Sequence, residues 1–277
     1  MLLETPVFGD VRPQGNLRLR RNALTNSMRL CAVWEGLRGR DLVLNRALLV
    51  DNDPTVNVTH TAGLMGPAGK TTATTQFWTW GAEGTSIRLP TTMCTVAILR
   101  RRADTTIRDA AFFGAAMATA AQRMTLSTFT DNNIYWDFGG VTGANRISVT
   151  ATGNITVNLE AWVAVAGVRG SAIYRNGLRL VAQTTAITRS VGTASLVVPG
   201  AASTAGDPQE IYQFLLLEQE WTPTQVMEWT VAPWGSIFEG PRRRLGRRAA
   251  AAPAPTLTQV GGPSWRGMNR GLNRGSS

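Results

Sequence analysis

Residue types on which much catalysis and metal binding depend are scarce in this 277-residue chain. It has one histidine, His60, and two cysteines, Cys31 and Cys94. A zinc site needs several His or Cys ligands, and a Ser–His–Asp site needs a histidine placed between partners, so neither chemistry is favoured. Each cysteine lies in an apolar, strand-like run, which predicts two small buried hydrophobic side chains.

Long apolar runs are also missing. No stretch reaches the roughly 18 apolar residues that a membrane-spanning helix requires, so we expect no membrane partner. The first residues, Met1 to Pro6, lack the basic start, apolar run and cleavage site of a secretory signal. A phosphate-binding loop is not expected either, because Pro67 removes an amide donor from the only similar stretch, Gly66 to Thr71.

Lysine is nearly absent, since Lys70 is the only one among 28 basic residues. We attribute this bias to codon usage in a GC-rich genome. The net charge of +10 is concentrated at the end, because residues 241–277 contain eight arginines and no acidic residue. This tail is either a solvated segment or one that docks on an acidic partner surface. Nucleic acid is a weaker candidate, because the tail has few aromatic residues.

Three zones follow from the composition. Residues 1–27 form an irregular leader or anchor, residues 28–238 a β-rich domain, and residues 239–277 a tail rich in Arg, Ala, Pro and Gly. The tail cannot bury enough apolar surface to fold alone. The candidate anchoring residues are the arginines of both ends: Arg18, Arg20, Arg21, Arg242, Arg243, Arg244, Arg247 and Arg248.

The central zone consists of short strand-like runs separated by turn residues. The predicted strands are 28–34, 94–99, 123–129, 134–138, 146–151, 154–157, 162–168, 172–175, 178–182, 195–198 and 211–217. Short strands at this spacing predict an all-β fold, an antiparallel two-sheet jelly-roll sandwich. Asn176-Gly177 predicts a two-residue hairpin turn, and 131–133 predicts a second hairpin.

One short helix is expected near the end of the central zone. Thr222 is a good N-cap, Pro223 suits the first helical position, and Gln225 can close a capping box. The helix should run from about residue 223 to 230 and end before Pro233. A second, Ala-rich stretch, 115–121, is either a helical turn or a loop.

Three blocks carry a resemblance to a known family. The first joins Arg21-Asn22, the strand 30–34, and a glycine-rich turn that closes at Asp41. The second runs from Trp162 through 174–177, Tyr-Arg-Asn-Gly. The third spans 211–238 and ends on a Pro-Trp-Gly-Ser-Ile-Phe segment that contains Trp234. In this order they resemble the concanavalin A-like or laminin G-like (LamG) sandwich domains of tailed bacteriophages and prophages.

The resemblance implies a concanavalin A-like sandwich with Trp162 between the sheets and Asn176-Gly177 in the hairpin turn. It further implies a non-enzymatic virion structural protein, made in the bacterial cytoplasm and displayed on the virion surface. Capsid decoration, head fibre, and neck or tail appendage all fit. The implied partners are capsid, portal/neck or tail proteins. The chain itself is expected to form a homo-oligomer. The alternative is a carbohydrate-binding module that attaches to host polysaccharide.

A catalytic carboxylate pair and a calcium site are the alternatives to this interpretation. Glycosidases need paired carboxylates, and Glu218 and Glu220 share a strand face, but they have the pattern of a solvated strand end. We therefore predict no catalytic residue, no cofactor and no enzyme. Calcium at the rim of the sandwich is a weaker hypothesis, with oxygen ligands in 51–53 and 131–133, which are also ordinary turn sequences.

The nine tryptophans are the remaining binding candidates. Trp34, Trp136 and Trp162 lie in predicted strands and are assigned to the core. Those that flank the predicted helix, Trp221, Trp229 and Trp234, should pin it to the sandwich. Trp78 and Trp80 are two apart and face one side of a strand. They are either core residues or a platform for a glycan or a neighbouring subunit.

Overall fold

The structure is a computed structural model, and it describes residues 17–35, 38–50, 59–63, 66–115, 119–150, 157–200 and 205–239. The chain divides into two units, Met1–Pro241 and Arg242–Ser277, and every described residue belongs to the first. The tail arginines of the predicted anchor, Arg242 to Arg248, lie outside the described residues, as do the possible ligands 51–53.

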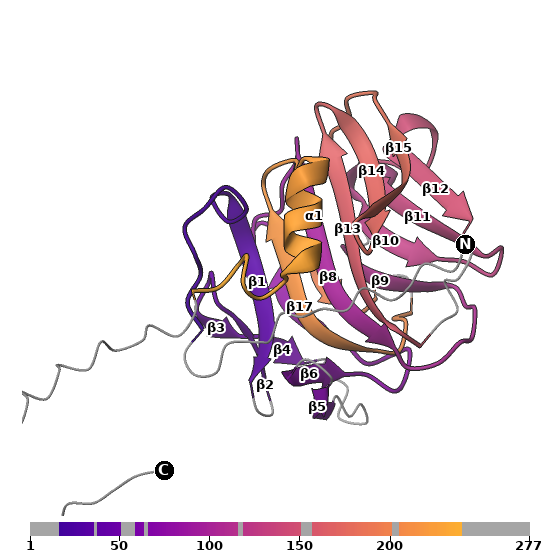
Figure 1. Cartoon of the computed structure of the whole chain (residues 1–277). Helices are drawn as coiled ribbons and strands as arrows, with labels where there is room; N and C mark the ends of the chain where they lie inside the picture. The colour runs from indigo at the N-terminus through magenta and orange to yellow at the C-terminus, as the bar shows by residue number, and fades with distance from the viewer. Residues whose placement is uncertain are drawn as a thin grey trace, which may run out of the picture. The chain divides into compact units, whose positions relative to one another are not determined.

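Two antiparallel sheets make up the described part of the chain (Figure 1). The larger sheet has the order β15 (Leu178–Gln183), β14 (Gly170–Arg175), β13 (Leu159–Gly167), β8 (Cys94–Arg102), β17 (Gln209–Leu217), β1 (Met28–Glu35), β2 (Arg38–Asp41) and β3 (Arg46–Ala47). Beside this path, β6 (Gly66–Lys70) pairs with β17 and with β5 (Thr59–Gly63).

The smaller sheet has the order β12 (Arg146–Thr150), β11 (Asn133–Phe138), β10 (Met124–Thr128), β9 (Ala110–Ala115), β16 (Ser195–Val198), β7 (Trp78–Ala82) and β4 (Leu49–Val50). The predicted two-sheet antiparallel sandwich is confirmed. The predicted helix is confirmed as well, as α1 (Pro223–Val231).

The central strands of the larger sheet are buried on both faces. Leu30, Ala32 and Trp34 of β1 point into the layer between the sheets, whereas Cys31 and Val33 point to the opposite face. The same alternation occurs in β8, β13 and β17. A strand covered on both faces has a continuous apolar sequence, and for this reason the sequence predicts these strands.

The second apolar layer lies between the outer face of the larger sheet and α1 (Figure 1). Trp221, Trp229 and Trp234 are buried in it, as expected of residues that pin the helix. We call it the outer layer, and the one between the sheets the inner layer. Both cysteines are buried and unpaired, Cys94 in the inner and Cys31 in the outer layer.

Residues 17–27, assigned to the leader from sequence, contact the last described segment. Leu19 pairs with Phe238, and Glu239 N donates to the carbonyl of Arg18 at 2.8 Å. Arg20 Nε donates to the carbonyl of Phe238 at 2.7 Å. Because Leu24 is only 1% exposed, this part of the leader packs on the sandwich.

The hairpin between β14 and β15 has the turn that its sequence predicts. Asn176 and Gly177 have φ angles of 51° and 79°. Such positive φ values suit glycine and asparagine better than other residues. Asn176 also binds β13, because its Oδ1 accepts from Ala161 N at 2.9 Å. The turn therefore holds three strands in register.

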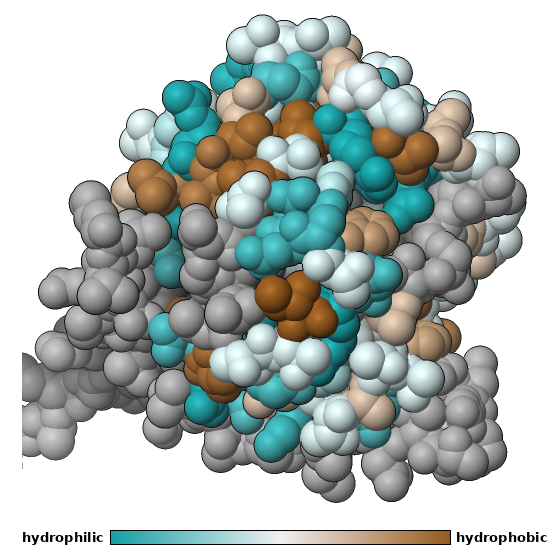
Figure 2. Space-filling view, turned by 90° about the vertical axis from the view of Figure 1, so that its right-hand side faces the viewer, coloured by the Kyte–Doolittle hydropathy of each residue, from teal (hydrophilic) through white to brown (hydrophobic). Residues whose placement is uncertain are grey.

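Strand β9, by contrast, was not expected, because its Ala-rich sequence has weak β propensity. The neighbouring Ala-rich stretch contains a 3₁₀ turn, η1 (Ala120–Gln122), while residues 116–118 are outside the described part. No described helix has the length and apolar character needed to cross a membrane. On the side seen in Figure 2, hydrophobic residues form separate groups among hydrophilic ones.

Candidate binding pocket

Trp78 and Trp80 belong to the inner layer, where they are 0% and 1% exposed. Trp78 packs edge-on against Trp34 with ring centroids 5.2 Å apart. Trp80 Nε1 donates to Oδ2 of the buried Asp41 at 2.8 Å. The surface-platform alternative is therefore wrong, because β7 turns this face toward the opposite sheet.

The remaining predicted tryptophans keep their structural roles. Trp162 is fully buried in the inner layer, where its ring lies 5.5 Å from that of Phe112. Its Nε1 donates to Oε2 of Glu160 at 2.8 Å. Trp234 is buried in the outer layer and stacks on Phe238 at 5.6 Å. Arg18, Arg20 and Arg21 are exposed, and their anchoring role stays a prediction.

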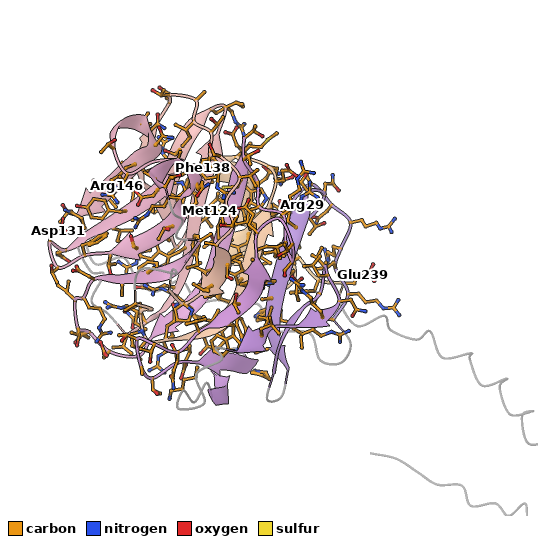
Figure 3. All side chains as sticks on the ribbon, turned by 180° about the vertical axis from the view of Figure 1, so that it is seen from behind. Arg29, Met124, Asp131, Phe138, Arg146 and Glu239 are labelled. Carbon is orange, nitrogen blue, oxygen red and sulfur yellow. The ribbon has the colours of Figure 1, made fainter. Side chains whose placement is uncertain are left out.

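The two carboxylates considered for catalysis, Glu218 and Glu220, are engaged by separate arginines. Glu218 is paired with Arg29 and Glu220 with Arg169. Asp131 lies on the opposite side of the molecule from Arg29 (Figure 3).

Asp131 itself closes the β10–β11 hairpin. Its Oδ1 accepts from Asn133 N at 2.9 Å and its Oδ2 from Tyr135 OH at 2.5 Å, and these bonds lower the pKa of its carboxyl. Among the described residues no group of three or more His, Cys, Asp or Glu could hold a metal. Calcium binding stays a prediction, since residues 51–53 are not described.

A pocket opens on the outer face of the larger sheet, beside the start of α1. Its cavity volume is about 190 Å³. The base is formed by small apolar side chains of β13, β14 and β15, namely Val165, Ala172 and Ala182. The wall and rim residues are Arg169, Gly170, Ser171, Tyr174, Arg179, Gln183, Thr184, Glu220, Trp221, Thr222 and Pro223.

One side of the pocket is built by the tight turn between β13 and β14. Arg169 in this turn binds Glu220 three times: its Nε donates to Oε2 at 2.9 Å, its backbone N to Oε1 at 3.0 Å, and its Nη2 to the Glu220 carbonyl at 2.7 Å. A Cβ at Gly167 would lie 2.1 Å from Oε1 of Glu220. Glycine at this position therefore lets the carboxylate reach the turn.

The opposite side is the segment that leads from β17 into α1. Thr95 of β8 fixes it, because its hydroxyl donates to the carbonyl of Gln219 at 2.7 Å and accepts from Trp221 N at 2.9 Å. Thr222 then caps the helix by a reciprocal capping box with Gln225. The side chain of Trp221 is 2% exposed, and its Nε1 has no hydrogen-bond partner in the described part of the chain.

Tyr174 and Arg179 form the third side. They are paired across the β14–β15 hairpin, so their side chains emerge from the same sheet position. Burial raises the pKa of Tyr174, while the charges of Arg179 and Arg169 act in the opposite direction. The phenol is thus neutral at ordinary pH and can donate or accept a hydrogen bond.

These residues combine an apolar base, aromatic groups and several polar groups that converge on one small volume. Pockets of this composition bind small organic ligands, although their volumes more often fall between about 300 and 1,000 Å³. The present cavity suits a single ring rather than a long chain. Sequence reasoning missed it, because its residues come from 165–184 and 220–223 and form no recognisable motif.

Comparison with known proteins identifies the fold. No protein-family model and no curated protein matches the sequence. Among solved structures, the binding domain of Paraclostridial Mosquitocidal Protein 1 is similar, with 12% identity, 75% of this chain and 52% of that chain covered, and a TM-score of 0.56. A Trypanosoma rangeli sialidase in complex with sialic acid has 12% identity over 75% of this chain and 33% of its own, with a TM-score of 0.55.

A third structure is similar over nearly its whole length. Domain 4 of AbnA, a GH43 extracellular arabinanase from Geobacillus stearothermophilus in complex with arabinotriose, has 13% identity, 74% and 99% coverage of the two chains, and a TM-score of 0.51. This chain spans about half of the first structure and a third of the sialidase. At these identities the likeness shows the fold alone, a β-sandwich.

Proposed function

We propose that this protein is a carbohydrate-binding module whose pocket beside α1 holds one sugar unit of a larger glycan. The observation that carries the proposal is the pocket itself. Val165, Ala172 and Ala182 offer a small apolar surface, and Arg179, Thr184 and Thr222 offer polar groups. A sugar presents both an apolar C–H face and hydroxyl groups, so it matches this mixture.

The structural neighbours support the same class of function. The AbnA domain was solved in complex with arabinotriose, and the Mosquitocidal Protein 1 domain is named a binding domain. A binding role also agrees with the scarcity of histidine and with the engagement of Glu218 and Glu220 by separate arginines. We therefore propose binding without catalysis.

A glycan array probed with the full-length chain tests the proposal. We expect signal for a restricted set of glycans, lost on Tyr174→Ala and kept in Trp78→Phe, which conserves an aromatic ring in the inner layer. Circular dichroism of both variants checks that they fold. A flat array at high protein concentration would contradict carbohydrate binding.

A second proposal concerns where the module works. The three sequence blocks that resemble laminin G-like phage domains, together with the arginine-rich end, favour a virion component of a tailed bacteriophage. In this setting the ends anchor the chain to capsid, neck or tail proteins, and the sandwich is displayed on the virion surface as a homo-oligomer. A decoration or appendage role and glycan attachment are compatible.

Electron microscopy of particles tests the second proposal, with absence of sandwich density from every virion surface as the contradicting result. Truncation after Gly240 tests the anchor separately. We expect the truncated chain to fold and to be incorporated less well than the full chain. Equal incorporation would show that the tail is not the anchor.

A further inference from the structure

The charges around the pocket do not cancel. Its ionisable rim residues include two arginines, Arg169 and Arg179, and one carboxylate, Glu220. Arg169 is the ion-pair partner of Glu220 at 2.9 Å. Arg179 has no ion-pair partner among the described residues. One guanidinium charge is therefore left over at the rim.

The hydrogen-bonding groups at the rim point to the same conclusion, that a donor is left without an acceptor. The carboxylate of Glu220 already accepts from the backbone and side chain of Arg169. The guanidinium of Arg179 is exposed and has no partner in the described part of the chain. A guanidinium can only donate hydrogen bonds. Arg179 consequently lacks an anionic acceptor among the described residues.

From this imbalance we infer that the pocket selects acidic sugars, with the sugar carboxylate on Arg179 and the sugar ring against the small apolar base. A planar carboxylate matches the fork of a guanidinium. The cross-strand pairing of Tyr174 with Arg179 places both residues on the same side of the pocket. This inference rests on the proposed carbohydrate function and specifies the class of ligand.

The small apolar base contributes to the same selectivity. Val165, Ala172 and Ala182 have apolar side chains, so the surface beside Arg179 is poorly solvated. The attraction between Arg179 and an anion near this surface is stronger than in bulk water, because the local dielectric constant is lower. Since Arg179 is exposed, added salt should still weaken it.

Calorimetric titration of the full chain with matched sugars tests the inference. The probes are glucuronate against glucose and galacturonate against galactose, each at low and high salt. We expect the acidic member of a pair to bind at least about ten-fold tighter, the usual contribution of a charge-assisted hydrogen bond. Arg179→Gln should remove this preference.

The matched control is Arg88→Gln, which removes the same charge from an exposed residue that does not line the pocket. It should leave the preference unchanged. Equal binding of acidic and neutral sugars, or a preference that survives Arg179→Gln, would overturn the inference and leave carbohydrate binding standing. A chain that binds none of these sugars and no glycan on the array would overturn the proposed function itself.

Discussion

The inner and outer layers of this sandwich are both rich in tryptophan, yet they differ in what surrounds the rings. In the inner layer Trp34, Trp78 and Trp162 are fully buried between two sheets. In the outer layer Trp221 is also buried, but it lines a pocket that carries an unpaired guanidinium. Aromatic residues lie in both layers, and at the edge of the outer one a pocket with polar residues opens to solvent.

The comparison indicates that residues in the middle of either layer stabilise the fold, whereas residues at the edge of the outer layer also line a binding pocket. A large ring in the middle of a layer contributes mainly to stability, because its surroundings are apolar and closely packed. A ring at the edge can still contact a ligand while it supports the fold. Substitutions in the two layers should therefore separate stability from binding, and the following four expectations run from the largest effect to the smallest.

Trp162→Ala should be the most damaging change. The ring fills space between the sheets against Phe112, and its Nε1 satisfies the buried Glu160. Removing it leaves a cavity and should cost about 3–5 kcal/mol in the free energy of unfolding. Urea titration measures the loss, with Trp162→Phe as a milder control. A loss below about 1 kcal/mol would show that the inner layer is not closely packed there.

Asn176→Ala should destabilise the hairpin that supports Tyr174 and Arg179. The residue has a φ of 51°, which costs alanine about 1–2 kcal/mol. It also loses the bond to Ala161 N. Asn176→Gly retains the backbone freedom and should lose less. Thermal melts compare the variants, and equal melting temperatures for the Ala and Gly variants would contradict this explanation.

Glu220→Gln should change binding more than stability. Its partner Arg169 is 59% exposed, so loss of the pair should cost about 1 kcal/mol or less. Because the pocket then carries a further uncompensated positive charge, we expect glucuronate to bind more tightly. The control, Glu218→Gln, breaks the ion pair with Arg29 and should leave affinity unchanged. Weaker binding by Glu220→Gln would contradict the assigned charge balance.

The smallest effect concerns alkaline pH. Burial raises the pKa of Tyr174 above the ordinary tyrosine value of about 10 in the folded state. The unfolded chain therefore loses this proton first, and the contribution of Tyr174 to stability is present below about pH 10 and is lost as the pH rises through the folded pKa. Tyr174→Phe should flatten the decline of melting temperature above pH 10. An unchanged slope would show that Tyr174 ionises alike in both states.

The fold could be predicted largely from local signals. The continuous apolar runs of β1, β8, β13 and β17 arise because these strands are covered on both faces. Thr222, Pro223 and Gln225 marked α1, and Asn176-Gly177 marked the hairpin turn. Strand β9 was missed because alanine has little preference for strands, and its place is determined by β10 and β16 on either side.

The site could not be predicted in the same way. Trp78 and Trp80 are two apart and therefore share one face of a strand, but spacing does not say whether that face meets the other sheet. From the sequence, Glu220 was weighed as one of a pair of catalytic carboxylates. Its contacts instead make it the partner of Arg169, 51 positions earlier in the chain. Long-range contacts of this kind leave no local pattern.

The central claim, that ligand binds at the edge of the outer layer, is tested most directly by the indole N–H signals of the nine tryptophans. Nuclear magnetic resonance spectra of the ¹⁵N-labelled full chain are recorded during titration with glucuronate, and the signals are assigned by Trp→Phe variants. The signal of Trp221 should move in proportion to occupancy, while those of Trp78 and Trp80 stay fixed. Movement of Trp78 or Trp80 with Trp221 unchanged would contradict the account.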